Sequence, residues 1–352
     1  MKRILHYFNR DTIPPAFAKL FFYEYWPSWV LYFPAIFYWL YLGLRARSLT
    51  YFTLANPGVE NGGAFGGSKE KVLSKIADEY KPRTMQVEVS KGYSSFLEIF
   101  NETAFLFPII CKPEEGERGY RVKKVFSFDE LEAYFHSSPG NFIIQDFINY
   151  PEEYGVLFYR YPNGKTGISS LTKKRFLSVT GDGISTIKLL LQKSTRAKMQ
   201  IARLSKEKPS LLNRIPSEGE TVLVEPIGNH CKGTEFIDAC HLINQQLIDT
   251  FDKITKPIDG FYYGRFDLKT TSLEDLYQGK NIRVLELNGT NSEATHIYST
   301  DMNIVKAYRA IFDNFKIVFD IAMENKSKRM TPPSFFHVAK KVRTYFKSRN
   351  KN

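Results

Sequence analysis

Hydrophobic and polar positions along the chain predict strands and helices in mixed order from about residue 105 onward. Short apolar runs bounded by turn residues favour strands, and apolar positions three or four apart favour helices. The expected strands cover residues 107–112, 120–126, 142–148, 155–160, 167–172, 221–226, 262–269 and 282–287. The expected helices cover residues 68–80, 185–206, 235–254 and 303–323, and another begins at Ser127, where Glu130 completes a capping box. This order indicates an α+β fold with largely antiparallel strands, not a series of βαβ units.

An aromatic stretch near the N-terminus has a different pattern. Residues 25–44 are twenty consecutive uncharged positions, nine of them aromatic. Twenty apolar residues suffice for a membrane-spanning helix, but Pro27 and Pro34 interrupt the helical pattern, and Tyr and Trp prefer the membrane–water boundary. Three interpretations stay open: a helical segment docked on the core or lining a substrate site, an element in the membrane interface, and a true span.

The net charge of +12 is concentrated at the C-terminal end of the chain. No acidic residue follows Glu324, and residues 326–352 carry nine basic side chains, so residues 1–325 hold 40 basic and 37 acidic residues, a balance of +3. A near-neutral body removes most of the electrostatic case for nucleic acid as a partner. Apolar positions with helical spacing predict a basic amphipathic helix in the tail, suited to an anionic membrane surface; the alternative is a helix packed on the body with a solvated basic face.

The three cysteines indicate a reducing compartment. Cys111, Cys231 and Cys240 are odd in number and widely spaced, so they form neither a disulfide framework nor a zinc-binding pair. We therefore expect a cytoplasmic protein, with a peripheral position on the inner face of the cytoplasmic membrane as the more specific hypothesis.

Two predicted strands carry matched polar residues. Because strand side chains alternate, Arg265 and Asp267 share one face, as do Glu286 and Asn288, and a hairpin would bring these faces together. Two carboxylates and an amide oxygen suit Mg²⁺, and a guanidinium beside them can stabilise a phosphoryl group or an oxyanion. The alternative is an exposed strand face with ordinary ion pairs.

Two glycine-containing segments could approach an anion. Lys112 ends an apolar strand and is followed by the loop 114–119, whose glycines allow backbone N–H groups to reach a phosphate, although ordinary hairpin turns have similar spacing. The glycine-rich loop 56–69 could hold an anion at a helix N-terminus or could be a flexible connection with Ser68 as N-cap.

Residues 142–148 form an apolar strand that turns into a polar segment. Such a segment could hold adenine through backbone hydrogen bonds, and Glu152 or Glu153 could accept from ribose hydroxyls. The same pattern is also typical of a buried strand leaving a sheet.

The order of these motifs resembles that of the ATP-grasp superfamily, and in particular of the D-alanine–D-alanine ligases. The matching elements are the lysine strand with its loop, Gln145–Ile148 with a following glutamate, Arg-x-Asp at 265–267 and Glu-x-Asn at 286–288. Residues 179–187, 215–220 and 228–230 resemble cyanophycin synthetase and related amino-acid ligases. The two resemblances together cover about residues 84–325.

The resemblance implies an ATP-grasp fold, in which two α+β subdomains clamp ATP. The expected parts are an aromatic helical region (1–55), a linker with the first subdomain (56–150), the second subdomain (151–325) and the basic tail (326–352). The departures lie at two places: residues 1–55 do not resemble the N-terminal domain of those ligases, and the segment after Asn288 lacks their proline-glycine turn. D-alanine is therefore not the expected substrate.

The resemblance also implies roles for individual residues. Lys112 and Arg265 are expected to act in catalysis, and the expected ligands of one or two Mg²⁺ ions, which Mn²⁺ can replace, are Asp267, Glu286 and Asn288. The expected ATP contacts are Lys112, Glu115, Gly116, Arg118, Gly119, Gln145, Asp146, Ile148, Glu153 (or Glu152), and Lys173 or Lys174. The expected substrate contacts are Asn229, His230, Glu293 and His296. A solvated basic turn is the alternative for the two adjacent lysines, and a structural hydrogen bond is the alternative for His296.

The implied reaction is an ADP-forming ligation. A carboxylate attacks the γ-phosphate of ATP to give an acylphosphate, and an amine, thiol or hydroxyl then displaces phosphate. The expected substrates are a small-molecule or lipid-linked carboxylate and an amine-type nucleophile. The alternatives are a phosphotransferase acting on a small molecule and a membrane-bound protein that senses ATP without catalysis.

Overall fold

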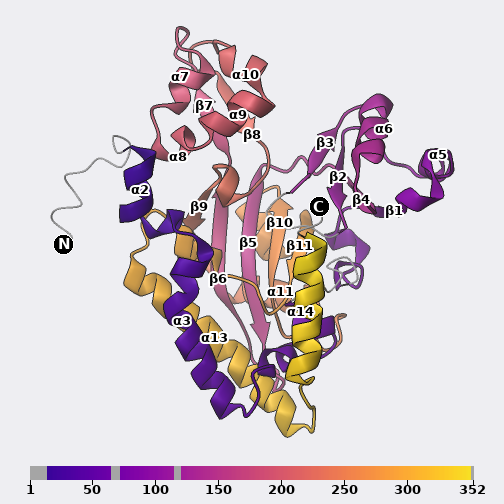
Figure 1. Cartoon of the computed structure of the whole chain (residues 1–352), viewed down its shortest axis with the longest axis vertical. Helices are drawn as coiled ribbons and strands as arrows, with labels where there is room; N and C mark the ends of the chain where they lie inside the picture. The colour runs from indigo at the N-terminus through magenta and orange to yellow at the C-terminus, as the bar shows by residue number, and fades with distance from the viewer. Residues whose placement is uncertain (1–13, 65–71, 115–119, 350–352) are drawn as a thin grey trace.

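The computed structural model describes residues 14–64, 72–114 and 120–349 and has an α+β architecture (Figure 1). Its framework consists of a five-stranded sheet with the order β11-β10-β5-β6-β9, a four-stranded sheet with the order β1-β4-β2-β3, and a two-stranded sheet of β7 and β8. Neighbouring strands in all three sheets are antiparallel. The predicted α+β class with antiparallel strands is confirmed.

The five-stranded sheet is the centre of the molecule. Its strands are β5 (Glu152–Arg160), β6 (Thr166–Arg175), β9 (Glu235–Asp238), β10 (Tyr263–Thr270) and β11 (Ile282–Asn288). Helices α11 (Gln245–Thr255) and α12 (Leu273–Gln278) cover one face, where Phe158 and Phe266 of the sheet and Phe251 of α11 are fully buried. On the other face α13 (Ile304–Ser327) packs over Leu157 and Tyr263. Side chains alternate along β10, so Arg265 and Asp267 lie on the same face as Tyr263, beyond the part that α13 covers.

The four-stranded sheet forms a separate lobe with its own core. Its strands are β1 (Thr84–Val87), β2 (Ile109–Pro113), β3 (Lys123–Val125) and β4 (Phe142–Asp146), with α5 (Tyr93–Glu102) and α6 (Phe128–Ser137) against it. Ser127 Oγ accepts a hydrogen bond from Glu130 N at 3.3 Å, as the capping box predicts. The Glu130 carboxylate, however, accepts from Phe126 N at 3.0 Å, one residue before the N-cap.

Residues 177–225 form a third unit, the small lobe, at the top of Figure 1. It contains β7 (Leu177–Thr180), β8 (Thr221–Glu225), α7 (Ile187–Leu191), α8 (Thr195–Lys198), α9 (Ile201–Glu207) and α10 (Pro209–Asn213). The single helix expected over 185–206 is wrong. The chain turns between three short helices, which lets Leu191, Ala197 and Leu204 all reach one apolar core.

The helix expected over 235–254 is confirmed only in its second half. Over 235–254, β9 pairs with the edge of β6, and the helix begins only at Gln245, because Asn244 caps it by accepting from Leu247 N. Of the helix expected over 68–80, residues 68–71 lie outside the described residues; Val72 and Leu73 are helical, and the chain then turns before the 3-10 helix at Asp78–Tyr80. The 3-10 helices are η2 (Tyr23–Tyr25), η3 (Tyr51–Ala55), η4 (Glu60–Gly63), η5 (Asp78–Tyr80), η6 (Val89–Lys91), η7 (His230–Lys232), η8 (Cys240–Leu242) and η9 (Thr295–Tyr298).

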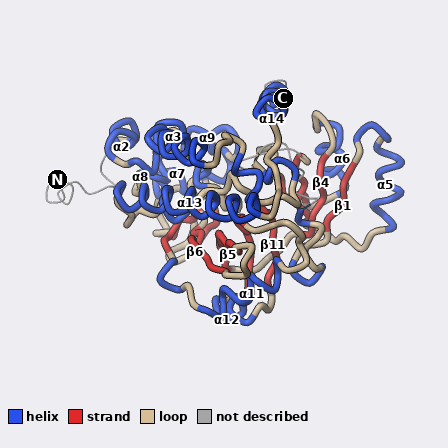
Figure 2. Tube along the Cα trace, turned by 90° about the horizontal axis from the view of Figure 1, so that it is seen from below, coloured by secondary structure: helices blue, strands red, loops and turns tan. Residues whose placement is uncertain are grey.

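The aromatic N-terminal region folds as two helices, α2 (Pro15–Phe21) and α3 (Ser28–Arg45). Helix α3 continues through the exposed Pro34, contrary to the predicted interruption, because Leu31, Ala35 and Leu42 anchor it on both sides of the proline in a core shared with α13. Figure 2 shows α3 stacked outside α13, on the side of the sheet opposite α11 and α12. No helix in the described part of the chain is long and apolar enough to cross a membrane.

The predicted C-terminal helix is present as α14 (Phe335–Arg349). Val338 is buried, whereas Phe335 and Phe336 are exposed. Lys341 forms an ion pair with Glu60 at 2.7 Å, so the helix is tied to the body at this point.

Candidate active site

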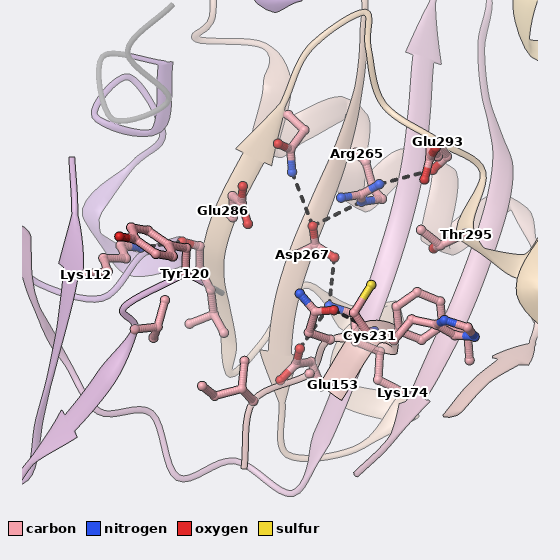
Figure 3. A pocket seen from close by; sticks show the side chains of 18 of the residues that line it. Lys112, Tyr120, Glu153, Lys174, Cys231, Arg265, Asp267, Glu286, Glu293 and Thr295 are labelled. Atoms are coloured by element: carbon pink, nitrogen blue, oxygen red, sulfur yellow. Dashed lines mark hydrogen bonds and ion pairs between the residues drawn. The ribbon is translucent and has the colours of Figure 1, made fainter. Parts of the chain in front are cut away.

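A cavity of about 870 Å³ lies where the two larger sheets, the small lobe and the N-terminal region meet (Figure 3). One wall is the polar end of the five-stranded sheet, and the facing wall is one face of the four-stranded sheet, formed by side chains of β1, β4 and β2. The N-terminal region contributes Lys19 and residues 24–28, so this part of it lines the cavity, as one of the three interpretations of the sequence predicts.

The predicted hairpin of polar strands is confirmed. In the antiparallel pairing of β10 with β11, Arg265 lies opposite Asn288 and Asp267 lies opposite Glu286. All four side chains line the cavity. The connection between the strands contains helix α12 in addition to turns, which does not prevent the pairing.

Asp267 is the centre of a buried ionic network. Its Oδ1 lies 2.9 Å from Lys174 Nζ, and its Oδ2 lies 3.0 Å from Arg265 Nε and accepts from Asn288 Nδ2 at 3.3 Å. Lys174 Nζ also lies 2.9 Å from Glu153 Oε1, so the charges alternate in the order Glu153, Lys174, Asp267, Arg265. Burial disfavours the ionised carboxyl of Asp267, but the two adjacent cations outweigh burial and hold its pKa well below the ordinary value.

The pairing of β5 with β6 decides which of the adjacent acidic and basic residues face the cavity. Glu153 lies opposite Lys174 in this register, and both line the cavity. Lys173 and Glu152 lie on the opposite face, where they form an ion pair at 2.5 Å and do not line the cavity. Gly155 lies opposite Asp267, and a Cβ there would lie 3.3 Å from Thr295 Oγ1 and 3.5 Å from Asp267 Oδ1.

The residues of the hairpin fit a magnesium ion by their chemistry. Asp267 and Glu286 are hard oxygen donors, and Asn288 uses its Nδ2 to donate to Asp267, which leaves its Oδ1 as the atom that can bind a cation. In the described part of the chain, no group of three or more His, Cys, Asp and Glu residues could hold a metal. A site here therefore depends on the amide and on ligands from water or substrate, which is typical of Mg²⁺.

Lys112 projects from the facing wall. It lies across the cavity from Glu286 in Figure 3, and its Nζ donates to Gln145 Oε1 and to the backbone oxygen of Leu285, both at 3.2 Å. These bonds place a cation between the two sheets, because one partner belongs to β4 and the other to β11.

The other expected ATP contacts differ in their placement. Asp146 and Ile148 line the cavity, and Arg83 donates to both carboxylate oxygens of Asp146 at 3.2 and 3.3 Å. Four expected contacts lie outside the described residues: Glu115, Gly116, Arg118 and Gly119.

The expected substrate contacts separate into two groups. Asn229, His230 and Glu293 line the cavity. His296 does not: it is buried, and its Nδ1 lies 2.7 Å from Ser170 Oγ, so its expected role as a substrate contact is corrected to a structural hydrogen bond.

His230 occupies an aromatic corner of the cavity. Its ring lies 5.3 Å from the ring of Phe236 and 5.4 Å from that of Tyr298. Its Nε2 is buried and has no hydrogen-bond partner among the residues that the structure describes. Burial, and then the nearby Arg196, lower the pKa of His230 from 6.5 to about 3.

His230 therefore makes stability depend on pH. Between about pH 3 and 6.5 the unfolded chain binds this proton and the folded chain does not, so the free energy of unfolding falls as the pH is lowered through this window. Lowering the pH from about 7 to about 5.5 should cost about 1 kcal/mol at this residue. Urea unfolding should show a smaller loss over this interval in His230→Gln than in the native chain. Exposed His136→Gln is the control, and an unchanged pH dependence in His230→Gln would contradict the prediction.

Sequence reasoning did not single out the part of the N-terminal wall that faces His230. Arg196 Nη2 lies 3.2 Å from Glu24 Oε2, both side chains are largely buried, and the guanidinium lies 5.5 Å from the ring centroid of Tyr25. This ion pair joins η2 to α8 of the small lobe. A lone Glu beside aromatic residues and a lone Arg in a short helix carry no joint signal in the sequence.

The glycine-rich loop packs against the turn that follows Asn288. Thr290 N donates to the backbone oxygen of Gly62 at 3.0 Å, and a Cβ on Gly289 would lie 2.5 Å from the same oxygen and 2.7 Å from the Cα of Gly63. Close backbone contact explains Gly62, Gly63 and Gly289. The part of the loop from 65 to 69 lies outside the described residues.

Gly289→Ala should therefore destabilise the protein by about 1–3 kcal/mol, because the added methyl group meets backbone that cannot rotate away. The matched control is Gly140→Ala, since a Cβ at Gly140 would have no heavy atom within 4 Å. Thermal unfolding of both variants checks the prediction. Equal melting temperatures would show that the backbone of Gly62 and Gly63 accommodates the added methyl group without loss of stability.

Comparisons with known proteins give weak similarities. No protein-family model and no curated protein matches the sequence. Among solved structures, the VanG D-Ala:D-Ser ligase from Enterococcus faecalis aligns at 12% identity and a TM-score of 0.41, over 73% of this chain and 60% of that one. The D-alanine–D-alanine ligase from Bacillus anthracis aligns at 14% identity and a TM-score of 0.39, over 74% of this chain and 67% of that one. The bifunctional glutathione synthetase from Pasteurella multocida aligns at 16% identity and a TM-score of 0.36, over 70% of this chain and 35% of that one.

Solved structures similar to this chain thus include D-alanine–D-alanine ligases, the family that the sequence motifs resemble. The chain spans 60% of the length of the D-Ala:D-Ser ligase and about a third of the glutathione synthetase. No residue role follows from alignments with TM-scores below 0.5, and the chemistry of this site rests on its own side chains.

Proposed function

We propose that this chain is an ATP-grasp ligase that forms ADP while joining a carboxylate to an amine-type nucleophile. The observation that carries the proposal is the alternating network of Glu153, Lys174, Asp267 and Arg265, with Glu286 beside it on the cavity wall. Buried cations next to oxygen donors suit a triphosphate and its metal ion. Among the described residues expected to contact ATP, metal or substrate, all except Glu152, Lys173 and His296 line one cavity, which supports the resemblance seen in the sequence.

Each residue has a role that its position supports. Asp267, Glu286 and Asn288 would hold Mg²⁺, which supplies charge neutralisation on the phosphates when bound. Lys112 and Lys174 extend from facing walls, so they can bind phosphate oxygens from two sides. Arg265 is fixed by Asp267 and by the backbone oxygen of Glu293 at 3.3 Å, and it can stabilise negative charge on the transferred phosphoryl group and on a tetrahedral intermediate.

The nucleotide would lie along the four-stranded sheet. Gln145 is buried in β4, accepts from Lys112 and donates to Thr84 Oγ1 at 3.1 Å, so this part of the wall is held in place. Residues 146–148 follow it along the cavity and can offer backbone groups to adenine. Glu153 is the glutamate on the cavity side and is the proposed ribose contact. Its carboxylate would then accept from the ribose hydroxyls while it keeps its ion pair with Lys174.

The other end of the cavity supports an amphiphilic acid as substrate. Tyr25, Trp26, Phe236 and Tyr298 line it, and Asn229 and Glu293 add polar groups. Aromatic walls bind an apolar body, while the polar groups orient the reacting end. A lipid-linked carboxylate fits this combination, and the proposed place of the reaction is the inner face of the cytoplasmic membrane.

Lys112→Met should raise the KM for ATP by roughly 10- to 100-fold, because a charge-assisted contact to phosphate contributes on the order of 1.5–3 kcal/mol. ADP release measured against ATP concentration checks this prediction. Lys123→Met, an exposed lysine on the adjacent strand β3, is the matched control and should leave the KM unchanged. An unchanged KM in Lys112→Met would remove this lysine from the ATP site.

Product analysis tests the proposed reaction. The chain is incubated with ATP, Mg²⁺, amphiphilic acids and amines, and hydroxylamine is added to trap an acylphosphate as a hydroxamate. A ligase gives ADP with a hydroxamate or amide. A stable phosphoester would identify a phosphotransferase, and ATP binding without ADP formation would identify a sensor.

A further inference from the structure

The outer surface of α3 exposes a continuous row of large apolar side chains. We name this row the outer α3 face; it consists of Trp29, Phe33, Ile36, Phe37, Leu40 and Leu44. These side chains are 37% to 76% exposed. With 3.6 residues per turn they fall within a stripe about 100° wide. Neighbouring α2 adds the exposed Phe17, Leu20 and Phe21.

The inner side of α3 already provides the packing that holds the helix to the protein. Leu31, Ala35 and Leu42 are buried in the core shared with α13. A helix that is apolar on both sides is normally enclosed on both sides. The outer α3 face is therefore the second contact surface of this helix, and exposed apolar patches of this kind mark sites of association.

We propose that the outer α3 face binds the surface of an anionic lipid bilayer, with α3 lying in the plane of the interface. Charge favours this partner, since no acidic residue occurs from Tyr25 to Val59, while Arg45 and Arg47 follow the stripe and Lys19 precedes it. Trp and Tyr beside Phe and Leu are typical of side chains that lie at the headgroup boundary.

The C-terminal helix supplies further positive charge on the same side of the molecule. Figure 2 shows α14 and α3 both on the side of the five-stranded sheet opposite α11 and α12. Lys340 and Arg343 of α14 are exposed. Basic side chains near an anionic leaflet each contribute attraction at moderate ionic strength, which adds to the insertion of the apolar stripe.

A second copy of the chain fits this face less well. A symmetric dimer through α3 would place Arg45, Arg47 and Lys19 of each copy close to the same basic residues of the other. Like charges oppose such pairing. An anionic surface compensates them instead.

Docking through α3 places the cavity close to the lipid. Residues 24–28 lead directly into α3 and line the cavity. A substrate with an acyl or polyprenyl portion could therefore reach the site without leaving the interface completely. Lipid binding is measured without nucleotide, so its outcome is separate from that of the proposed ligase reaction.

Vesicle sedimentation with the full chain tests the proposal. Vesicles of equal parts phosphatidylcholine and phosphatidylglycerol should bind the native chain, and vesicles of phosphatidylcholine alone should bind it much less. The variant Trp29→Ser/Phe33→Ser/Phe37→Ser should bind the anionic vesicles at least about tenfold more weakly, since three large apolar side chains no longer enter the interface. Native-like affinity in this variant, or no binding by the native chain, would overturn the proposal.

The matched control removes exposed apolar side chains elsewhere. Ile184, Leu189 and Leu223 of the small lobe are 82%, 51% and 50% exposed, and their simultaneous replacement by Ser should leave vesicle binding unchanged. Equal loss of binding in both triple variants would contradict a specific role of α3. Light scattering of the native chain distinguishes a self-association surface: a dimer that the α3 variant disperses, without vesicle binding, would also overturn the proposal.

Tryptophan fluorescence gives a test that needs no variant. All three tryptophans, Trp26, Trp29 and Trp39, lie in this part of the chain, and Trp29 is 74% exposed. Anionic vesicles with brominated acyl chains should quench the emission of the native chain, because Trp29 would enter the lipid. Emission that is equal with brominated and ordinary vesicles would contradict insertion of this face.

Discussion

Asp267→Asn is expected to lower the rate of ADP formation by about a thousandfold or more. The carboxylate is proposed to hold Mg²⁺, and it also contacts Lys174 and Arg265 at 2.9 and 3.0 Å. A neutral amide of the same shape loses the metal charge partner and leaves Arg265 without its closest anion. Losing several kcal/mol of transition-state stabilisation corresponds to this factor, since about 1.4 kcal/mol changes the rate tenfold.

The measurement is ADP release under saturating ATP over a range of Mg²⁺ concentrations. Exposed Asp313→Asn on α13 is the matched control and should react like the native chain. Circular dichroism and urea unfolding establish that the Asp267→Asn variant is folded before its rate is interpreted. A folded variant with native turnover would remove Asp267 from the metal site.

The polar hairpin could be predicted from the sequence because its information is local. Alternation with a period of two places Arg265 with Asp267 and Glu286 with Asn288, and the two strands are near neighbours along the chain. Their antiparallel pairing then follows almost directly. The strands, helix and N-cap around Ser127 were predictable for the same reason, since each depends on a few consecutive residues.

The remaining features depend on contacts between distant segments. Which of two adjacent lysines faces the cavity is decided by the register of β5 with β6, which contains an irregularity between Leu157 and Phe158. The helix expected over 235–254 begins with an edge strand because β6 offers a free partner there, which no local pattern records. The ion pair of Glu24 with Arg196 joins residues 172 positions apart.

Adjacent lysines of β6 should differ sharply in their contribution to stability. Lys174 is buried between the carboxylates of Glu153 and Asp267, each 2.9 Å from its Nζ. Burial disfavours its charged form, but the two carboxylates outweigh burial and raise its pKa. Lys174→Met leaves two buried carboxylates with one cation fewer, so the free energy of unfolding should fall by about 3–5 kcal/mol. Lys173→Met should cost about 0–1 kcal/mol, because its ion pair with Glu152 is partly exposed.

Urea unfolding of both variants at neutral pH measures this difference, and a double variant identifies its cause. Glu153→Gln removes one of the carboxylates that Lys174→Met leaves unpaired, so the two changes together should cost less than the sum of their separate effects. Simple packing loss at Lys174 predicts additive costs instead. Equal destabilisation by Lys173→Met and Lys174→Met would contradict the buried network, whereas a large loss at Lys174 with strong non-additivity would establish that its charge holds the two acidic residues of the cavity in place.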